Sequence, residues 1–295
     1  MAFTMGEPNT VLTESIRSMI IMGERMTGKT ENCAQLPNAL LIDILGHAKN
    51  YITKAKIWDF QKELARENAE IEASNKALLA ANPQAMKKAL FSPYGYLFEF
   101  SKYLRALPQN KKPAFLIFDS LTDLEQLSLS RANWLFKQTG PGSTYTGNNV
   151  IADLDYGKGQ IFLKDAIKPI TDNFLLGSTE CTILLGHLTT KTSVKEKELT
   201  VTDIDLTSQI KKLLTGNVEA TAILSRNATG AQNTLDFKNL GDSLIVGGRP
   251  SHVKGKEFII SELKDDQGKL ATDGTHLTTF WENIFPDYFK TLTNK

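Results

Sequence analysis

Gly23-Glu24-Arg25-Met26-Thr27-Gly28-Lys29-Thr30 has the residue types and the spacing of a loop that binds phosphate. The segment fits the pattern G-x-x-x-x-G-K-[ST] at every fixed position. Glycines at the two corners let backbone N–H groups turn inward and approach phosphate oxygens without an obstructing side chain. We expect Lys29 to contact the β- and γ-phosphates of ATP or a related triphosphate, and the Thr30 hydroxyl to ligate Mg²⁺. The predicted nucleotide-binding set is Gly23, Glu24, Arg25, Met26, Thr27, Gly28, Lys29, Thr30 and Glu31.

A strand and a helix must hold this loop in place. The apolar, β-prone run Ser18 to Met22 precedes it, and the segment after Gly28 opens a helix. Unpaired N–H groups and the positive dipole end of that helix favour an anion. The helix should be short, because Pro37-Asn38 follows Leu36 and stops it. The alternative is a strand, a turn and a helix that bind nothing.

Two further apolar runs end in an acid: Ala39-Leu40-Leu41-Ile42-Asp43 and Pro113-Ala114-Phe115-Leu116-Ile117-Phe118-Asp119. Continuous apolar runs of this kind are typical of parallel strands covered on both faces. In phosphate-loop NTPases such a strand carries the acid that holds Mg²⁺, often through water. The position of Asp119, about 90 residues after the loop, favours this role over a purely structural one.

Composition bounds the class of protein. The 295 residues carry 34 Lys and Arg against 33 Asp and Glu, a formal net charge of +1, so no global basic field indicates nucleic-acid binding. The two cysteines, Cys33 and Cys181, are too few for a disulfide framework and fit small reduced core residues. No basic-then-apolar leader and no membrane-spanning run is present, so we expect a cytoplasmic protein, in the host cytoplasm if a phage encodes it, with no membrane partner.

The rest of the chain supplies further predicted elements. Residues 54–81 lack Gly and Pro and predict one long helix or a helical hairpin, and a second helix is expected over 95–107. The segment 136–160, rich in Gly, Ser, Thr and Asn, predicts a long mobile loop. A helix at 162–176 then leads to a strand at 182–187 that ends in His187. A charged loop should follow, then a helix at 204–214, a strand at 220–224 and antiparallel strands that include 243–247 and 256–261.

With these pieces in order, the chain resembles the RecA-like P-loop ATPases, specifically the AAA-type proteins encoded by phages, some of which act in recombination or single-strand annealing. The resemblance is carried by Gly23–Thr30, Leu36–Asp43, Leu116–Thr122, Leu184–His187 and Gly247–Glu262. It implies an α/β fold with a mostly parallel central sheet flanked by helices, antiparallel C-terminal strands and a helical insertion. We expect an N-terminal arm (1–16), an ATPase core (17–265) with the insertion at about 54–107, and a C-terminal extension (266–295).

The resemblance also implies roles for single residues. Lys29 and Thr30 become phosphate and Mg²⁺ ligands, and Asp119 becomes the metal acid. His187 falls where the fold places a polar sensor of the γ-phosphate; the alternative is a capping or core-edge histidine. The basic residues Arg249, Lys254 and Lys256 lie where oligomers of this family, rings or filaments, send cations into a neighbour's site; the alternative is a solvated basic hairpin.

The sequence departs from the family at the expected catalytic base. RecA-type ATPases usually place a glutamate two residues beyond the acid of the second strand, but here the run is Asp43-Ile44-Leu45. Hydrolysis would then depend on another acid or be slow. Asp43 is the first candidate for the base, because in this family the end of the second strand lies beside the phosphates, and Glu125 is another candidate.

The leading hypothesis is an ATP- and Mg²⁺-dependent, self-associating ATPase that acts on single-stranded DNA in phage recombination or replication. DNA would pass the loops at 138–160 and 189–203. The predicted contacts are Tyr145 and Tyr156 for stacking and Lys191, Lys195 and Lys197 for phosphates. A nucleotide-binding switch or assembly protein with little hydrolysis is the alternative. A small-molecule kinase is disfavoured, because no Arg-rich lid segment is present.

Overall fold

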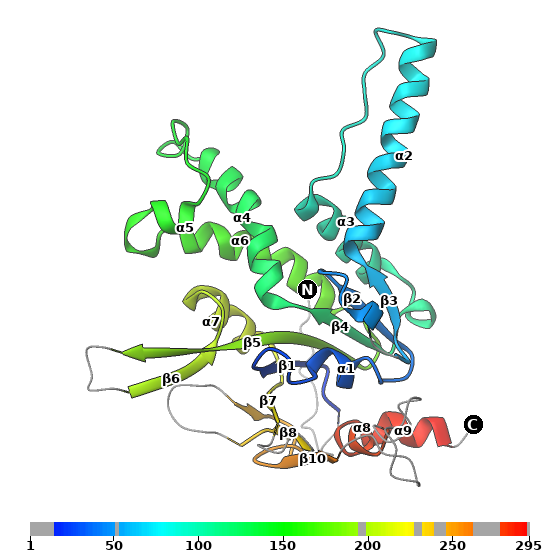
Figure 1. Cartoon of the computed structure of the whole chain (residues 1–295), viewed down its shortest axis with the longest axis vertical. Helices are drawn as coiled ribbons and strands as arrows, with labels where there is room; N and C mark the ends of the chain where they lie inside the picture. Colours follow the sequence, from blue (N-terminus) through cyan, green and yellow to red (C-terminus); the bar gives the residue numbers. More distant parts are fainter. Residues whose placement is uncertain are drawn as a thin grey trace, which may run out of the picture.

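The computed structural model describes residues 15–50, 53–193, 199–226, 232–238, 246–261 and 278–293. They form one mixed sheet in the order β10-β8-β7-β1-β5-β4-β2-β3, with β6 paired to β5 and β9 to β7 (Figure 1). The strands are β1 Ser18–Gly23, β2 Ala39–Asp43, β3 Lys56–Asp59, β4 Phe115–Asp119, β5 Cys181–Ser193, β6 Leu199–Ile204, β7 Ala220–Arg226, β8 Gln232–Asp236, β9 Gly247–Gly248 and β10 Glu257–Ser261. The predicted α/β class is confirmed.

Three of the parallel strands, β1, β3 and β4, are followed directly by an α-helix. The helices are α1 Lys29–Cys33, α2 Phe60–Ala81, α3 Pro93–Ala106, α4 Leu121–Lys137, α5 Val150–Asp153, α6 Gly159–Leu175, α7 Ser208–Asn217, α8 Thr278–Ile284 and α9 Pro286–Thr293, with short 3₁₀ turns at Ala48–Asn50, Gln109–Lys111 and Asp155–Gly157. The short α1 agrees with the prediction. No described helix combines the length and the apolar character that crossing a membrane requires.

The strands from β7 to β3 run parallel, so their carboxyl ends meet at one edge of the sheet. Gly23 at the end of β1 pairs with His187 on β5, and Asp43 at the end of β2 pairs with Asp119 at the end of β4. β5 separates β1 from β4 in the sheet. The register therefore places the predicted loop, both acids and the histidine along the same edge.

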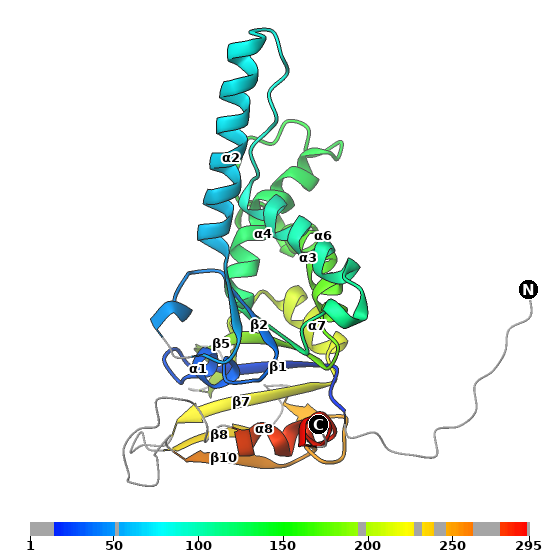
Figure 2. The same ribbon diagram turned by 90° about the vertical axis from the view of Figure 1, so that its right-hand side faces the viewer.

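Alternate residues of β1 enter two separate cores, which explains its continuous apolar character. Met19 and Ile21 belong to the core shared with α1, α8 and α9, whereas Ile20 and Met22 belong to the core under α3, α4, α6 and α7. The sheet is thus covered on both faces, with α3, α4 and α6 on one side (Figure 2).

The prediction for 54–81 is wrong at its start. Lys56–Asp59 forms β3, a parallel edge strand on β2, and α2 begins only after Asp59, whose carboxylate caps it by accepting from the Lys62 N–H at 3.0 Å. The remaining residues form one helix rather than a helical hairpin. That helix projects away from the sheet, and the chain returns alongside it (Figures 1 and 2).

Two asparagines on α2 hold the returning chain against the helix. The Asn75 amide donates to the Lys88 carbonyl and accepts from the Lys88 N–H, both at 2.8 Å. Asn68 makes the same pair of bonds with Phe91, at 3.1 and 2.8 Å. Because the two asparagines are seven residues apart, they lie on one face of the helix. The helix and the returning chain together span residues 60–92.

The expected loops and helices around β5 also differ from the structure. The predicted loop at 136–160 contains α5 and a 3₁₀ turn, and α6 begins at Gly159. The predicted charged loop after His187 is instead an antiparallel ribbon, because β5 continues to Ser193 and pairs with β6. The helix expected at 204–214 runs over Ser208–Asn217, since Ile204 still pairs with Leu188 in that ribbon.

The described part of the predicted C-terminal extension packs into the core. Trp281 on α8 is 1% exposed, and its indole N–H donates to the Asn32 carbonyl of α1 at 3.1 Å. Ile284, Phe285 and Phe289 fill the same core. Most of the predicted N-terminal arm (residues 1–14) and the turn expected at 265–268 lie outside the described residues.

Candidate functional site

The loop after β1 has the backbone geometry that its glycines predict. A Cβ on Gly23 would lie 2.5 Å from the Leu224 carbonyl oxygen, so only glycine fits there. Gly28 has a φ of +84°, in the left-handed region that glycine adopts without strain. α1 begins directly after it, with its first N–H groups facing the loop. We refer to residues 23–30 as the P-loop, after the sequence motif that they match.

Lys29 lies inside the P-loop rather than in solvent. Its ammonium donates to the Gly23 carbonyl at 2.9 Å and to the Glu24 carbonyl at 2.6 Å, and the side chain is 5% exposed. Burial lowers the pKa of the Lys29 ammonium, and the charge of Asp119 opposes this effect. The geometry holds a cation at the mouth of the loop, where an incoming phosphate would meet it.

Thr30 and Asp119 meet although 89 residues separate them in the chain. The Thr30 hydroxyl donates to Asp119 Oδ2 at 2.5 Å. Burial raises the pKa of the Asp119 carboxyl, while the hydrogen bond from Thr30 lowers it and the charge of Asp43 raises it. A hydroxyl and a carboxylate oxygen suit Mg²⁺, which is held by one or two protein oxygens together with substrate phosphates. Among the described residues, no group of three or more His, Cys, Asp or Glu is arranged so that it could hold a metal ion.

His187 has a buried ring nitrogen that needs a partner. It ends the part of β5 that pairs with β1, and its Nδ1 makes no hydrogen bond within the described structure. Burial, together with the positive charges of Lys29 and Arg25, lowers the pKa of the His187 imidazole. The ring is therefore neutral at pH 7, with Nδ1 free to bond a group that enters the site.

One cavity of about 490 Å³ brings these residues together. It is lined by Arg25, Met26, Gly28, Lys29, Thr30, Glu31, Asp43, Leu45, His47, Asn50, Asp119, Thr122, Asp123 and His187. Glu24 and Thr27, from the predicted set, instead shape the loop: the Thr27 hydroxyl donates to the Glu24 carbonyl at 3.0 Å. The sequence analysis missed His47, Asn50, Thr122 and Asp123, although each follows a strand that ends at this edge.

Asp43 is committed to the backbone of the segment that follows it. One carboxylate oxygen accepts the N–H of Gly46 at 2.8 Å and the other accepts the N–H of Ala48 at 2.7 Å, and the residue is 3% exposed. The carboxylate thereby organises the turn that carries Leu45 and His47 into the cavity wall. Its predicted role as a base stays a prediction.

The other predicted contact residues lie away from this cavity. Arg249, Lys254 and Lys256 flank β9 and β10 and do not line it, so delivery into a neighbour's site stays a prediction. The Tyr145 ring packs against Phe136 with centroids 5.1 Å apart, and its hydroxyl bonds to Asp153. Tyr156 lies in a 3₁₀ turn and Lys191 on the β5–β6 ribbon, opposite Val201, whereas Lys195 and Lys197 lie outside the described residues.

No protein-family model and no curated protein matches this chain. Among solved structures, the RadB recombinase is 12% identical with a TM-score of 0.35, over 86% of this chain and 90% of that one. The flagellar accessory protein FlaH from Methanocaldococcus jannaschii is 15% identical with a TM-score of 0.31, over 85% and 86%. Both likenesses are distant.

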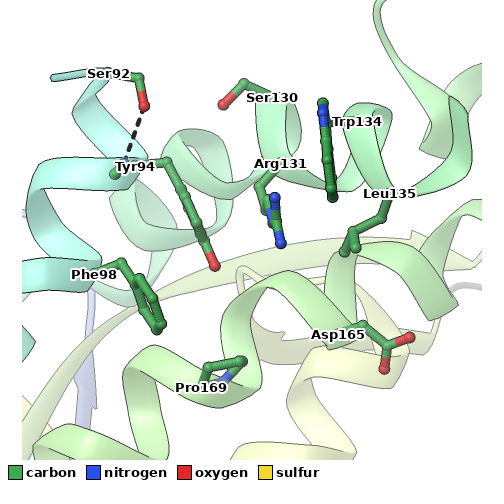
Figure 3. Close-up of a pocket in the computed structure, with 10 residues that line it drawn as sticks. Ser92, Tyr94, Phe98, Ser130, Arg131, Trp134, Leu135, Asp165 and Pro169 are labelled. Atoms are coloured by element: carbon green, nitrogen blue, oxygen red, sulfur yellow. Dashed lines mark hydrogen bonds between the residues drawn. The ribbon is translucent and has the colours of Figure 1, made fainter. Parts of the chain in front are cut away.

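A second hollow, of about 520 Å³, lies between α3, α4 and α6 and contains none of the P-loop residues (Figure 3). Tyr94 and Phe98 face Arg131 across it, and the Arg131 guanidinium lies 4.0 Å from the centre of the Trp134 ring. The Tyr94 hydroxyl donates to the Ala166 carbonyl at 2.8 Å. The hollow is therefore an aromatic feature of the helical layer, separate from the cavity at the sheet edge.

Proposed function

We propose that this chain is a RecA-like P-loop ATPase that binds ATP together with Mg²⁺. The observation that carries the proposal is the convergence of Lys29, Thr30 and Asp119 on one cavity at the carboxyl edge of a parallel sheet. The unpartnered Nδ1 of His187 in the same wall adds a buried polar atom that a ligand would satisfy. A structural turn alone accounts for neither the buried cation nor the unpartnered nitrogen.

Each residue then has a role at a stated atom. The backbone N–H groups of the P-loop and the start of α1 hold the phosphates, and Lys29 Nζ neutralises charge at the β- and γ-phosphates. Thr30 Oγ1 and Asp119 Oδ2 would hold Mg²⁺, which when bound would neutralise the charge that develops on the phosphates. His187 Nδ1 is placed to hydrogen-bond the γ-phosphate or the water beside it.

The test is phosphate release from ATP with Mg²⁺, measured for the natural protein and for Lys29→Ala. Lys102→Ala is the matched control, because Lys102 is an exposed lysine that pairs with Glu99 on α3, away from the cavity. Loss of nucleotide binding and turnover in Lys29→Ala alone supports the proposal. Equal behaviour of the two variants would refute it.

We extend the proposal to single-stranded DNA as a substrate in phage recombination or replication, with a ring or filament as the active form. The support is the sequence resemblance, together with the β5–β6 ribbon that continues from the strand carrying His187. Affinity for single-stranded DNA should fall with salt, because each phosphate contact releases counterions. A salt dependence with a slope near zero would exclude this extension.

A nucleotide-controlled assembly protein with little turnover is a second candidate. Leu45 favours it: this side chain lines the cavity and is 51% exposed, at the position where the family usually supplies a glutamate. Nucleotide-dependent oligomers with negligible phosphate release would support the assembly protein. DNA-stimulated release would select the ATPase.

A further inference from the structure

We propose that Asp123 is the acid that orients and deprotonates the water attacking the γ-phosphate, in place of the glutamate that Leu45 does not supply. The inference rests on the proposed ATPase function. It concerns a residue that the sequence analysis did not consider, and it follows from how the acids around the cavity are engaged.

Four acids line the cavity within the described residues: Glu31, Asp43, Asp119 and Asp123. Both oxygens of Asp43 accept backbone N–H groups, and Asp119 accepts from Thr30 in the pair that suits a metal. Glu31 belongs to α1, and its Oε2 lies 3.8 Å from the place a Cβ on Gly28 would take, so it lies beside the loop rather than at the strand ends. Asp123 remains.

Asp123 has one oxygen available for a water. It lies in the first turn of α4, four residues after Asp119, and the Ser120 hydroxyl donates to its Oδ2 at 2.5 Å. Its Oδ1 makes no hydrogen bond within the described part of the chain. The residue is half-buried in the cavity wall. Ser120 thus engages one carboxylate oxygen and leaves the other without a partner among the described residues.

The Asp123 carboxylate acts electrostatically on both Asp119 and His187. The negative charge of Asp123 raises the pKa of both the Asp119 carboxyl and the His187 imidazole, so it lies within electrostatic reach of both. Asp43, Lys29, Arg25 and Asp205 are the other charged groups that act on these two residues. Glu125, by contrast, accepts from the Thr207 N–H at 3.1 Å and does not line the cavity.

The proposed hydrolysis needs only ATP, water and the Asp123 carboxylate. Asp123 Oδ1 accepts a proton from water as the water oxygen bonds to the γ-phosphorus. The bond between that phosphorus and the β,γ-bridging oxygen breaks, and its electron pair leaves on ADP. The carboxylic acid then passes its proton to the released phosphate, which restores the carboxylate. A positioned base of this kind contributes about 10²–10⁴-fold in rate.

A capping role for Asp123 is the competing explanation. Ser120 precedes α4 and Asp123 is its third residue, an arrangement that favours the helix start through the dipole even without catalysis. Ser120→Ala tests this: it removes the hydrogen bond between the two side chains and keeps the carboxylate. Glu125→Gln tests the other acid that the sequence analysis named as a candidate base, which lies on the same helix but does not line the cavity.

The experiment measures ATP affinity, kcat, KM and thermal stability with Mg²⁺ for the natural protein, Asp123→Asn, Ser120→Ala, Glu125→Gln and Asp123→Asn with Leu45→Glu. We expect kcat to fall about 100-fold or more in Asp123→Asn alone, with ATP affinity and stability kept. Ser120→Ala should lose less, and Glu125→Gln should keep kcat. Adding Leu45→Glu should restore part of the rate, because residue 45 also lines the cavity.

Each other outcome is decisive. Unchanged kcat in Asp123→Asn overturns the assignment while leaving the ATPase function intact. An equal loss in Ser120→Ala and Asp123→Asn, accompanied by lower stability, overturns it in favour of a capping role. If the natural protein binds ATP but releases no phosphate, the ATPase proposal fails first, and the assignment of Asp123 fails with it. If Lys29→Ala binds ATP normally, the cavity around the P-loop is not the ATP-binding site.

Discussion

Trp281 links the C-terminal helices to the helix of the P-loop, and replacing it should damage both stability and nucleotide binding. The side chain is 1% exposed, stacks on Phe285 with ring centroids 5.9 Å apart and donates to the Asn32 carbonyl. Truncating a buried Trp to Ala costs about 3–5 kcal/mol. Trp281→Phe should cost about 1–3 kcal/mol, because it leaves space unfilled and removes the indole bond to the Asn32 carbonyl, which then keeps only the Gln35 N–H at 3.3 Å.

These costs are a large part of a typical folding free energy of about 5–15 kcal/mol. For a chain of this size, Trp281→Ala should lower Tm by on the order of 10 °C, at about 2–4 °C per kcal/mol. The assay is urea unfolding followed by far-ultraviolet circular dichroism, together with equilibrium binding of fluorescent ATP. Leu292→Ala is the control, since Leu292 lies on α9 but is 37% exposed, and its loss should be below about 1 kcal/mol.

The binding assay separates local from global effects. Because Asn32 lies in α1, the helix that also carries Lys29 and Thr30, weaker packing should loosen the phosphate site before the whole domain unfolds. We expect ATP affinity to fall in Trp281→Phe at temperatures where the protein is still folded. Unchanged stability in Trp281→Ala would refute the placement of α8 in the core. Lower stability with unchanged ATP affinity would refute the coupling.

Three further outcomes are expected. Thr30→Val should weaken Mg²⁺ binding in the presence of ATP, by an amount that a magnesium titration can measure, while Mg²⁺-independent ATP binding persists. Because the pKa of the His187 imidazole is lowered from 6.5, the stability that this residue contributes is present above pH 6.5 and is lost as the pH falls below it. In His187→Gln, the free energy of unfolding measured from pH 7.5 to 5 should therefore depend less on pH. Asn75→Ala should free the Lys88 backbone and speed limited proteolysis of the returning chain, at a cost of about 1 kcal/mol or less.

Local patterns predicted the elements that are buried on both faces. The runs at β1, β2 and β4 are continuously apolar, and the structure confirms them to within two residues. The role expected for Asp119 followed from its place at a strand end about 90 residues after the phosphate-loop motif, although the sequence could not give its hydrogen bond with Thr30. These features depend on residue type and on neighbours in sequence, which a single chain reveals.

The elements that the sequence analysis missed depend on partners distant in sequence. Lys56–Asp59 is a four-residue edge strand that depends on pairing with β2 and on the stacking of Trp58 on Phe100, and both partners are distant in sequence. The ribbon after His187 looked like a charged loop because its stability comes from cross-strand pairing. Asp123 is one acid among several until the fold brings α4 to the sheet edge.

The two carbonyl bonds of Lys29 leave one donor of its ammonium uncommitted within the described residues. An ammonium carries three N–H donors, and the Gly23 and Glu24 oxygens accept two of them. The third donor can meet an anion without breaking either bond. The loop therefore holds this charge in position in advance, and a preorganised side chain loses little conformational freedom when a ligand binds.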